Sequence, residues 1–323
     1  MRVAVIGAGA MGALVAMLLC DAGEDVVVYD ADEEKAAAIG RSGITVRGDI
    51  GGGAMPEVGR KGEAGRPFDA VVVAVSAVES GNALRPLSPF VHRDTSYISL
   101  QEGAAVSALT GLVGEERAFA ALARVSAREV GHGEIEVEEF RSLSLAACVP
   151  GREEALAELE HALQSALPGK AAVSGDLEGE IWRRLEAAAA VSGLCAVAGM
   201  APAEARELRG LDALCGEAAL ECKRAAAPSG SGDQAQPTPW EDAVWSRVKP
   251  PMLIDVEAGR KTEIDHMSGH IVTHARARGI AVPVHGAILT LVREMESGRH
   301  RPGEGAVKEL KRRVDEEKGM SLL

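Results

Sequence analysis

The first half of the chain alternates short apolar runs with helical patterns. Strand-like runs rich in β-branched residues occupy residues 3–6, 25–29 and 70–75, and helical patterns occupy residues 11–22 and 33–39. This alternation predicts a parallel sheet with helices on both faces. The run at 70–75 is apolar without alternation, so we expect a central strand that is covered on both sides.

The middle of the chain is less regular. Residues 45–67 are rich in glycine and charge, and we expect a hairpin or a mobile loop there. Two more strand-like runs, at 135–137 and 143–147, precede a helical pattern at 153–167. The break that follows predicts a domain boundary near Ser174 and Gly175.

Everything after this boundary is predicted to be helical. A polar loop, residues 228–239, is expected to interrupt the helices. The predicted helices span residues 180–197, 203–227, 240–248, 262–278, 284–296 and 304–318. The fold class is therefore α/β, with a Rossmann-type doubly wound sheet in residues 1–174 and an all-helical domain in residues 175–323. The apolar faces of the helical domain also favour a homodimer.

Composition excludes several function classes. The net charge of −13 and the pI of about 5.2 argue against a nucleic acid partner. Five scattered cysteines, none spaced as C-x-x-C, indicate a reducing cytoplasm. The chain opens on a strand pattern, and its longest apolar stretch, residues 187–199, is shorter than the ~20 residues of a membrane span. No export signal or membrane anchor is expected.

A glycine motif lies between the first predicted strand and the first predicted helix. Its first glycine allows a tight turn, its second lets a pyrophosphate approach the backbone, and its third permits close helix packing. The next strand ends in Asp30, about 20 residues on, where a carboxylate can bond the adenosine ribose hydroxyls. The motif residues, all expected to contact the cofactor, are Gly7, Ala8, Gly9, Ala10, Met11 and Gly12.

The cofactor is expected to be NAD rather than NADP. A carboxylate at residue 30 repels a 2′-phosphate, and Ala31 follows it rather than an arginine. FAD is the other dinucleotide that this fingerprint serves, and a βαβ unit without a ligand is the alternative to binding.

The segment Met252–Asp265 contains the run D-x-x-x-G-R-x-T-E-I-D, and residues 279–283 read G-I-A-V-P. This run resembles the signature of ketopantoate reductases. Residues 180–185 are similar to that family's W-x-K-L helix, and residues 101–103 are in register with its H/Q-N-G turn. The resemblance implies a Rossmann domain, a helical domain and NAD(P)H-dependent reduction of a 2-oxo acid, as ketopantoate is reduced to pantoate.

The resemblance also implies roles for single residues. Glu263 would bind the cofactor or orient the catalytic cation, and Asp255 matches an aspartate on the substrate side. Gln101 and Gly103 would lie beside the cofactor.

Several positions depart from the family pattern. Arg184 stands where the family has its catalytic lysine, Ala188 and Ser192 replace substrate-binding asparagines, and Glu102 replaces the asparagine of the N-G turn. Pro251 replaces a substrate-binding serine. Ser76 replaces a lysine on the cofactor side. The carboxylate of Glu102 and the proline at 251, in place of two polar neutral groups, suggest a substrate unlike ketopantoate, either one that carries an amine or one that lacks a carboxylate.

The exchange of lysine for arginine changes the acid–base chemistry. Arginine stays protonated and offers fixed hydrogen bonds, so Arg184 can polarise a carbonyl but is a poor proton source. Glu102 is the replacement candidate, because a partly buried carboxyl can exchange protons near neutrality. The alternative is that Glu102 only pairs with Arg184.

Other interpretations stay open at this point. His266, His270 and His274 share one helix face, a spacing that can chelate zinc, but no distant further ligand is evident. No G-x-S-x-G elbow is present, which argues against a hydrolase. A β-hydroxyacid dehydrogenase and an NAD-binding sensor or scaffold without catalysis are the competing functions.

Overall fold

The computed structural model describes residues 1–59, 65–101, 103–226 and 248–320. Residue contacts divide the chain into two compact units. Unit 1 comprises residues 1–101 and 105–180, and unit 2 comprises residues 102–104 and 181–323. Glu102, the loop predicted at 228–239 and most of the helix predicted at 240–248 lie outside the described residues.

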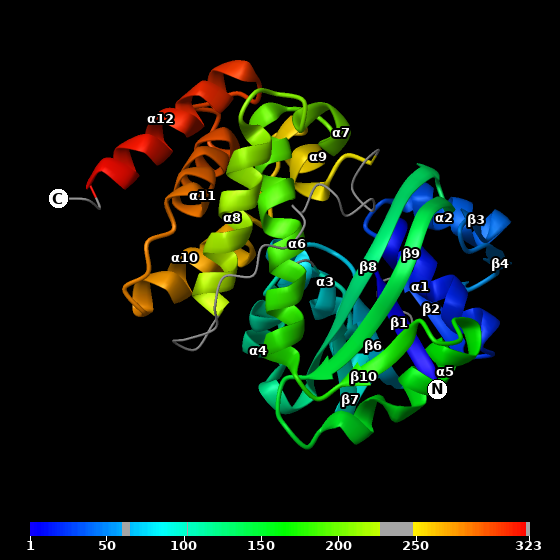
Figure 1. Ribbon diagram of the computed structural model, residues 1–323. Coiled ribbons are helices and arrows are strands. Elements are labelled where there is room, and N and C mark those ends of the chain that lie inside the picture. Colours follow the sequence, from blue (N-terminus) through cyan, green and yellow to red (C-terminus); the bar gives the residue numbers. More distant parts are fainter. Residues whose placement is uncertain (60–64, 102, 227–247, 321–323) are drawn as a thin grey trace. The chain divides into compact units, whose positions relative to one another are not determined.

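Unit 1 contains a mixed sheet with a parallel centre (Figure 1). The strand order is β4-β3-β9-β8-β7-β6-β1-β2-β5, and β10 pairs with β9. Pairing is parallel from β2 through β8, whereas β8 with β9 and β3 with β4 are antiparallel. The strands are β1 (Arg2–Ile6), β2 (Asp25–Tyr29), β3 (Ile44–Gly48), β4 (Gly52–Ala54), β5 (Glu57–Val58), β6 (Phe68–Val73), β7 (Val91–Ser99), β8 (Ala118–Gly131), β9 (Glu134–Ala147) and β10 (Ala171–Ser174).

Helices cover both faces of the parallel centre. Successive strand residues point to opposite faces of the sheet, so each central strand contributes side chains to two cores. Val3 and Val5 of β1 join the core beneath α1 and α5, whereas Ala4 and Ile6 join the core beneath η1 and α4. The fold class expected from the sequence is thereby confirmed. The helices of unit 1 are α1 (Ala10–Asp21), α2 (Glu33–Ser42), α3 (Ala77–Leu84), α4 (Val106–Val113) and α5 (Ala157–Ala166), with short 3-10 helices η1 (Arg85–Phe90), η2 (Glu115–Arg117) and η3 (Glu153–Leu156).

The sheet differs from the sequence prediction in its second half. Strands β7 and β8 were not predicted, because the first half of β7 contains the polar residues His92, Arg93 and Asp94 and β8 is rich in alanine. The two runs predicted at 135–137 and 143–147 form one strand, β9, which pairs along most of its length with β8. The region 45–67 does contain a hairpin, formed by β3 and β4.

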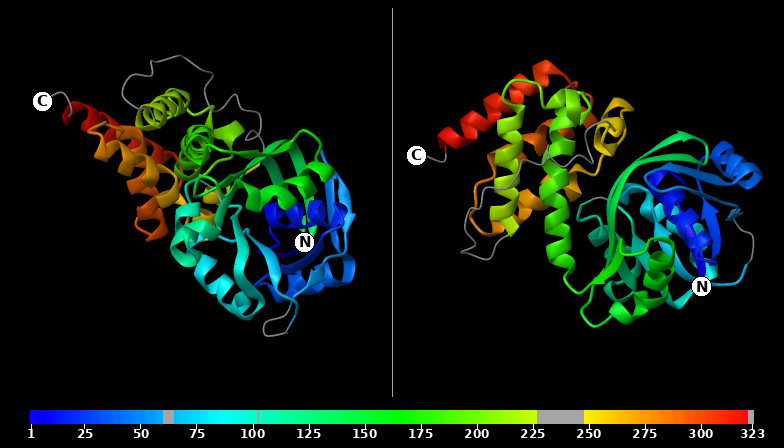
Figure 2. Two further views of the ribbon diagram at one scale, coloured as in Figure 1. Left: turned by 90° about the horizontal axis from the view of Figure 1, so that it is seen from below. Right: turned by 45° about the vertical axis from the view of Figure 1, so that its right-hand side comes forward.

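Unit 2 is a bundle of helices (Figure 2). Helix α11 packs against α8, α9, α10 and α12, and residues 188–198 of α6 are buried, as predicted. The helices are α6 (Leu177–Ala198), whose first turn belongs to unit 1, α7 (Pro202–Ala205), α8 (Leu211–Ala226), α9 (Pro251–Glu257), η6 (Ile264–His266), α10 (Ser268–Ala277), α11 (Pro283–Glu296) and α12 (Glu304–Met320).

Two helix predictions in this unit are wrong. The helix expected at 203–227 is split into α7 and α8, and the break contains Gly210 with a φ of +83°. The helix expected at 262–278 begins only at Ser268, because the backbone N–H and hydroxyl of Thr262 bond to Glu296 and hold residues 262–267 in a tighter turn. Among the described residues, no helix combines the length and apolar character that a membrane crossing requires.

Candidate active site

The glycine motif forms the turn between β1 and α1. Gly7 adopts a φ of +91°, and a Cβ on it would lie 2.8 Å from Cγ1 of Val75. A Cβ on Gly12 would lie 1.8 Å from the carbonyl oxygen of Gly7. Both positions therefore require glycine, the first for conformation and space and the second for close packing of α1 on the turn.

Gly9 differs from these two glycines. A Cβ on Gly9 would meet no atom within 4 Å, so the space in front of this residue is open. Gly9 is also the N-cap of α1, whose first turn has N–H groups without partners inside the helix. An open backbone cradle at a helix N-terminus fits a pyrophosphate.

Asp30 lies directly beside this cradle, at the end of β2. Its Oδ2 accepts the backbone N–H of Ala8 at 2.7 Å, and its Oδ1 accepts that of Asp32 at 2.9 Å. The neighbouring Asp32 caps α2, and hydrogen bonds from the backbone N–H groups of Lys35 and Glu34 lower the pKa of its carboxyl. The surroundings of residue 30 are thus acidic.

Two more residues that were expected on the cofactor side, Ser76 and Gln101, lie just after the carboxyl ends of β6 and β7. Ser76 caps α3, and its hydroxyl donates to Glu79 at 3.0 Å. The side-chain amide of Gln101 bonds within unit 1, to Val75, Ser80 and Ser99. The family turn continues in unit 2, where Gly103 has a φ of +62° and the N–H of Ala104 donates to the carbonyl of His266 at 2.9 Å.

Helix α6 carries Arg184, Ala188 and Ser192 four residues apart, which places them on one face of the helix. Arg184 is half-buried, whereas Ala188 and Ser192 are 1% and 0% exposed. The hydroxyl of Ser192 has no hydrogen-bond partner among the described residues. Along this face the side chains are, in order, a cation, a small apolar group and a buried hydroxyl.

The segment 252–265 of unit 2, which carries the family signature and is called the signature segment below, is held by ion pairs. Asp255 accepts two hydrogen bonds from Arg260, at 2.9 and 2.6 Å. Asp265 pairs with Arg293 at 2.7 Å. Glu296 accepts the N–H and hydroxyl of Thr262, both at 2.8 Å, and also pairs with Lys261. Pro251 is the exposed first residue of α9.

These contacts fix the position of Glu263, which lies between the anchored Thr262 and Asp265. Glu263 is half-buried and is the N-cap residue of the 3-10 helix η6. The anchors Arg293 and Glu296, both on α11, were missed by the sequence reasoning. Their charges were visible, but no local spacing links them to residues about thirty positions earlier.

Two of the three histidines, His270 and His274, form a ring cluster with Trp182. Rings of His270 and His274 lie 4.0 Å apart, and Trp182 packs against both. Burial lowers the pKa of His270 to about 4, with further contributions from His274 and His266. Among the described residues, no group of three or more His, Cys, Asp and Glu side chains is placed to hold a metal ion.

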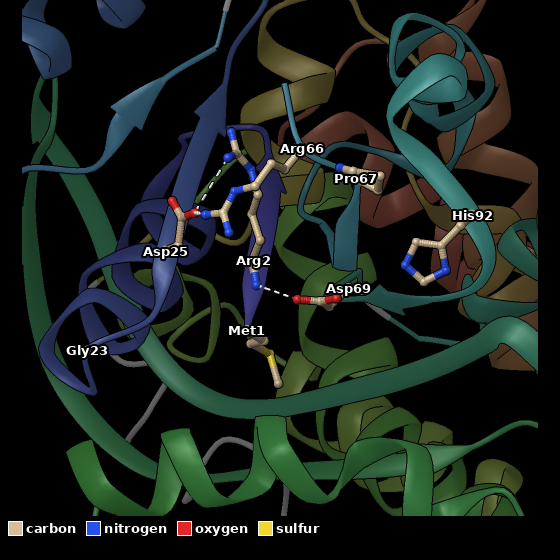
Figure 3. Close-up of a pocket in the computed structure, with 8 residues that line it drawn as sticks. All are labelled: Met1, Arg2, Gly23, Asp25, Arg66, Pro67, Asp69 and His92. Atoms are coloured by element: carbon tan, nitrogen blue, oxygen red, sulfur yellow. Dashed lines mark hydrogen bonds and ion pairs between the residues drawn. The ribbon is translucent and has the colours of Figure 1, made fainter. Parts of the chain in front are cut away.

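A pocket of about 590 Å³ lies at the opposite end of the sheet, around the amino ends of β1, β2, β6 and β7 (Figure 3). Its charged groups are paired with one another, since Asp25 binds the guanidinium groups of both Arg2 and Arg66. The pocket contains none of the residues of the glycine motif. We therefore place the candidate active site at the carboxyl ends of the strands, where ligands bind in folds of this class.

Residues 3–148 match the family described as ketopantoate reductase PanE/ApbA, and residues 176–296 match the C-terminal domain of the same family. Together the two matches cover most of the chain. The chain belongs to the ketopantoate reductase family. It is therefore an NAD(P)-dependent oxidoreductase that uses NAD(P)H, of a family whose reaction is the reduction of a 2-oxo acid.

Several known proteins are similar to this chain over most of its length, in sequence or in fold. An uncharacterized oxidoreductase of Bacillus subtilis (strain 168), YkpB, is 25% identical over 297 residues, which cover 88% of this chain and 95% of YkpB. The structure of 2-dehydropantoate 2-reductase from Geobacter metallireducens GS-15 is similar with a TM-score of 0.79 at 24% identity, covering 91% of this chain and 99% of that one. A D-mandelate dehydrogenase in complex with NADH and anilino(oxo)acetate is similar with a TM-score of 0.77 at 20% identity, covering 93% and 99%.

Proposed function

We propose that this ketopantoate reductase family member is an NADH-preferring reductase of a 2-oxo acid other than ketopantoate. Residues 1–174 would bind the dinucleotide and residues 175–323 the substrate. The observation that carries the proposal is the placement of the Asp30 carboxylate, 2.7 Å from the N–H of Ala8 and next to the open cradle at Gly9. Gly7 to Gly12 would hold the pyrophosphate.

The preference for NADH follows from the charges around residue 30. Asp32, Glu33 and Glu34 follow it at the start of α2, and the first cation of that helix, Lys35, is paired with Glu129 at 2.8 Å. A ribose hydroxyl can donate to the Asp30 carboxylate, whereas a 2′-phosphate would face several negative charges.

The substrate would be a 2-oxo acid with a largely apolar side chain. The face of α6 formed by Arg184, Ala188 and Ser192 offers one cation, one methyl group and one buried hydroxyl. Arginine is suited to a carboxylate or a polarised carbonyl, and the exchange of two asparagines for Ala188 and Ser192 removes amide groups that could bind a polar substrate. The related D-mandelate dehydrogenase structure, which contains NADH and anilino(oxo)acetate, supports testing aromatic 2-oxo acids first.

The reduction adds a hydride to the carbonyl carbon and a proton to the carbonyl oxygen, yielding the 2-hydroxy acid. Bound NADH would supply the hydride and would be converted to NAD⁺. The guanidinium of Arg184 would stabilise the negative charge that develops on the oxygen, and Glu263 would orient that cation. Because arginine keeps its proton, the proton would come from a carboxyl or from water, and Glu102, outside the described residues, stays our candidate.

The test is oxidation of NADH by the purified protein against a panel of 2-oxo acids. The panel contains ketopantoate, pyruvate, a branched aliphatic acid such as 2-oxoisovalerate, and phenylglyoxylate. We expect turnover of an apolar member to exceed that of ketopantoate. Tight NADH binding without turnover of any member would contradict the proposal and favour a sensor.

We also propose a cellular location and an oligomeric state. The sequence predicts a cytoplasmic protein, and it predicts a homodimer that forms through residues 175–323.

A further inference from the structure

We infer that Gln101 is a positioning residue that shapes the nicotinamide half of the cofactor site without contacting the cofactor through its side chain. The inference rests on the proposed function, because it takes the dinucleotide to lie over the glycine turn. It revises the role that the family resemblance implied for this residue.

The side-chain amide of Gln101 links three elements of unit 1. Its Oε1 accepts the hydroxyl of Ser99, at the end of β7, at 2.9 Å. Its Nε2 donates to the carbonyl of Val75, just after β6, at 2.6 Å, and to the hydroxyl of Ser80, on α3, at 2.7 Å. Both N–H groups of the amide are therefore used, and the carbonyl of Val75 can only accept, which fixes the amide orientation.

The network continues to the turn that follows β6. Ser80 is 1% exposed, and its hydroxyl passes the interaction on by donating to the carbonyl of Ser76 at 3.0 Å. Gln101 thus holds the backbone of both Val75 and Ser76, the first directly and the second through Ser80. Loss of the amide would leave buried hydrogen-bonding groups without partners.

The turn at Val75 and Ser76 borders the cofactor cradle. Gly7 packs so closely on this turn that a Cβ on Gly7 would lie 2.8 Å from Cγ1 of Val75 and 3.1 Å from the carbonyl oxygen of Ala74. A Cβ on Gly12 would lie 3.0 Å from Cβ of Ala74. Displacement of residues 74–76 would therefore change the wall next to the glycine turn.

Strand order decides which half of the dinucleotide is affected. Neighbouring strands run β2, β1, β6, β7. Asp30 ends β2 and would take the adenosine ribose, and the glycine turn after β1 would take the pyrophosphate. The next strand across is β6, so the residues after it would border the nicotinamide half. Gln101 therefore acts on that half and leaves the adenosine half unchanged.

The experiment compares two ligands on two variants. ADP carries only the adenosine and diphosphate part, whereas NADH carries both halves. In Gln101→Met, which keeps the length of the side chain but removes the amide, we expect the Kd for NADH to rise about tenfold, because the displaced turn at residues 74–76 fits the nicotinamide half less well. The Kd for ADP, measured by isothermal titration calorimetry, should change by less than about twofold, within the variation of a site that is not touched.

The matched control is Thr95→Val. The buried hydroxyl of Thr95 also ties β7 to β6, by donating to the carbonyl of Phe68 at 2.7 Å, but at the amino ends of the strands. This variant should lower the melting temperature as Gln101→Met does, yet leave both Kd values unchanged. Should Gln101→Met not fold, Ser80→Ala interrupts the same network, and we expect about a threefold rise in the NADH Kd alone.

Equal weakening of NADH and ADP in the Gln101 or Ser80 variant would overturn the inference, and so would unchanged NADH binding. The proposed function fails separately. If the wild-type protein binds neither ADP nor NADH, both ideas are wrong. If the wild type binds both, and Asp30→Asn weakens ADP while Gln101→Met leaves NADH unaffected, only the role of Gln101 is wrong.

Discussion

The two units use different atoms to build their parts of the site. In unit 1 the cradle consists of backbone at Gly7, Gly9 and Gly12, and the carboxylate of Asp30 beside it accepts the backbone N–H groups of Ala8 and Asp32. In unit 2 the signature segment is held by side-chain ion pairs, such as Asp255 with Arg260.

This difference suggests that unit 1 determines cofactor binding and unit 2 determines substrate specificity. A backbone cradle depends on turn geometry that only glycine permits, so any change there affects the cofactor whatever the substrate is. Side-chain pairs can anchor a loop while other positions of unit 2, such as Ala188 and Ser192, take side chains that suit the substrate. We therefore expect cofactor chemistry to follow unit 1 and substrate choice to follow unit 2.

The largest effect is expected at Arg184. Replacement by methionine removes the cation that would stabilise the developing alkoxide, so kcat should fall by about 10²–10³-fold, as for other lost transition-state donors. The Kd for NADH should stay unchanged, because the cradle is formed by the backbone of unit 1. Stopped-flow turnover and NADH fluorescence titration measure the two quantities.

The control for this change is Arg183→Met, which removes the same charge from an exposed neighbour on α6. It should keep kcat within about twofold of the wild type. If Arg184→Met weakens NADH binding as much as it lowers kcat, unit 2 would also determine cofactor binding, and the comparison would fail.

A smaller effect concerns the stability of unit 2. Glu221 is fully buried and accepts the N–H groups of Val284 and His285, at the start of α11, each at 2.9 Å. Burial raises the pKa of its carboxyl from 4.5 to about 7, in spite of these two hydrogen bonds. Between these two values the unfolded chain loses the proton while the folded chain keeps it.

The stabilising contribution is therefore complete below pH 4.5 and is lost as the pH rises through about 7. We expect Glu221 to lower the free energy of unfolding by up to about 3 kcal/mol across this range. Urea unfolding at several pH values measures it. Glu221→Gln should flatten this dependence, whereas Asp212→Asn, which removes an exposed carboxyl from the same helix, should not. An equally steep dependence in Glu221→Gln would contradict the assignment.

The smallest effect is expected at Asp255. Its partner Arg260 is more than half exposed, so the pair contributes at most about 1 kcal/mol to stability. Asp255→Asn should lower the melting temperature slightly and keep kcat/KM within about threefold. A loss of kcat/KM of a hundredfold or more would show that Asp255 contacts the substrate, as the family resemblance implied.

The sequence predicted the parts of this molecule that depend on local pattern. The strand β2, the turn at Gly7–Gly12 and the long buried helix α6 follow from periodicity and glycine spacing. The partners of side chains did not follow, because Thr262 with Glu296 and Gln101 with Ser80 join residues far apart in sequence. The start of α10 was mispredicted for the same reason.

The most direct test of the account is the ratio of kcat/KM with NADH to that with NADPH, using the best 2-oxo acid of the panel. The repulsion between the Asp30 carboxylate and a 2′-phosphate predicts a preference for NADH of at least about tenfold. Asp30→Asn, which keeps an acceptor for the N–H of Ala8, should reduce that preference by about tenfold. A wild-type preference for NADPH, or a ratio that Asp30→Asn leaves unchanged, would contradict the account.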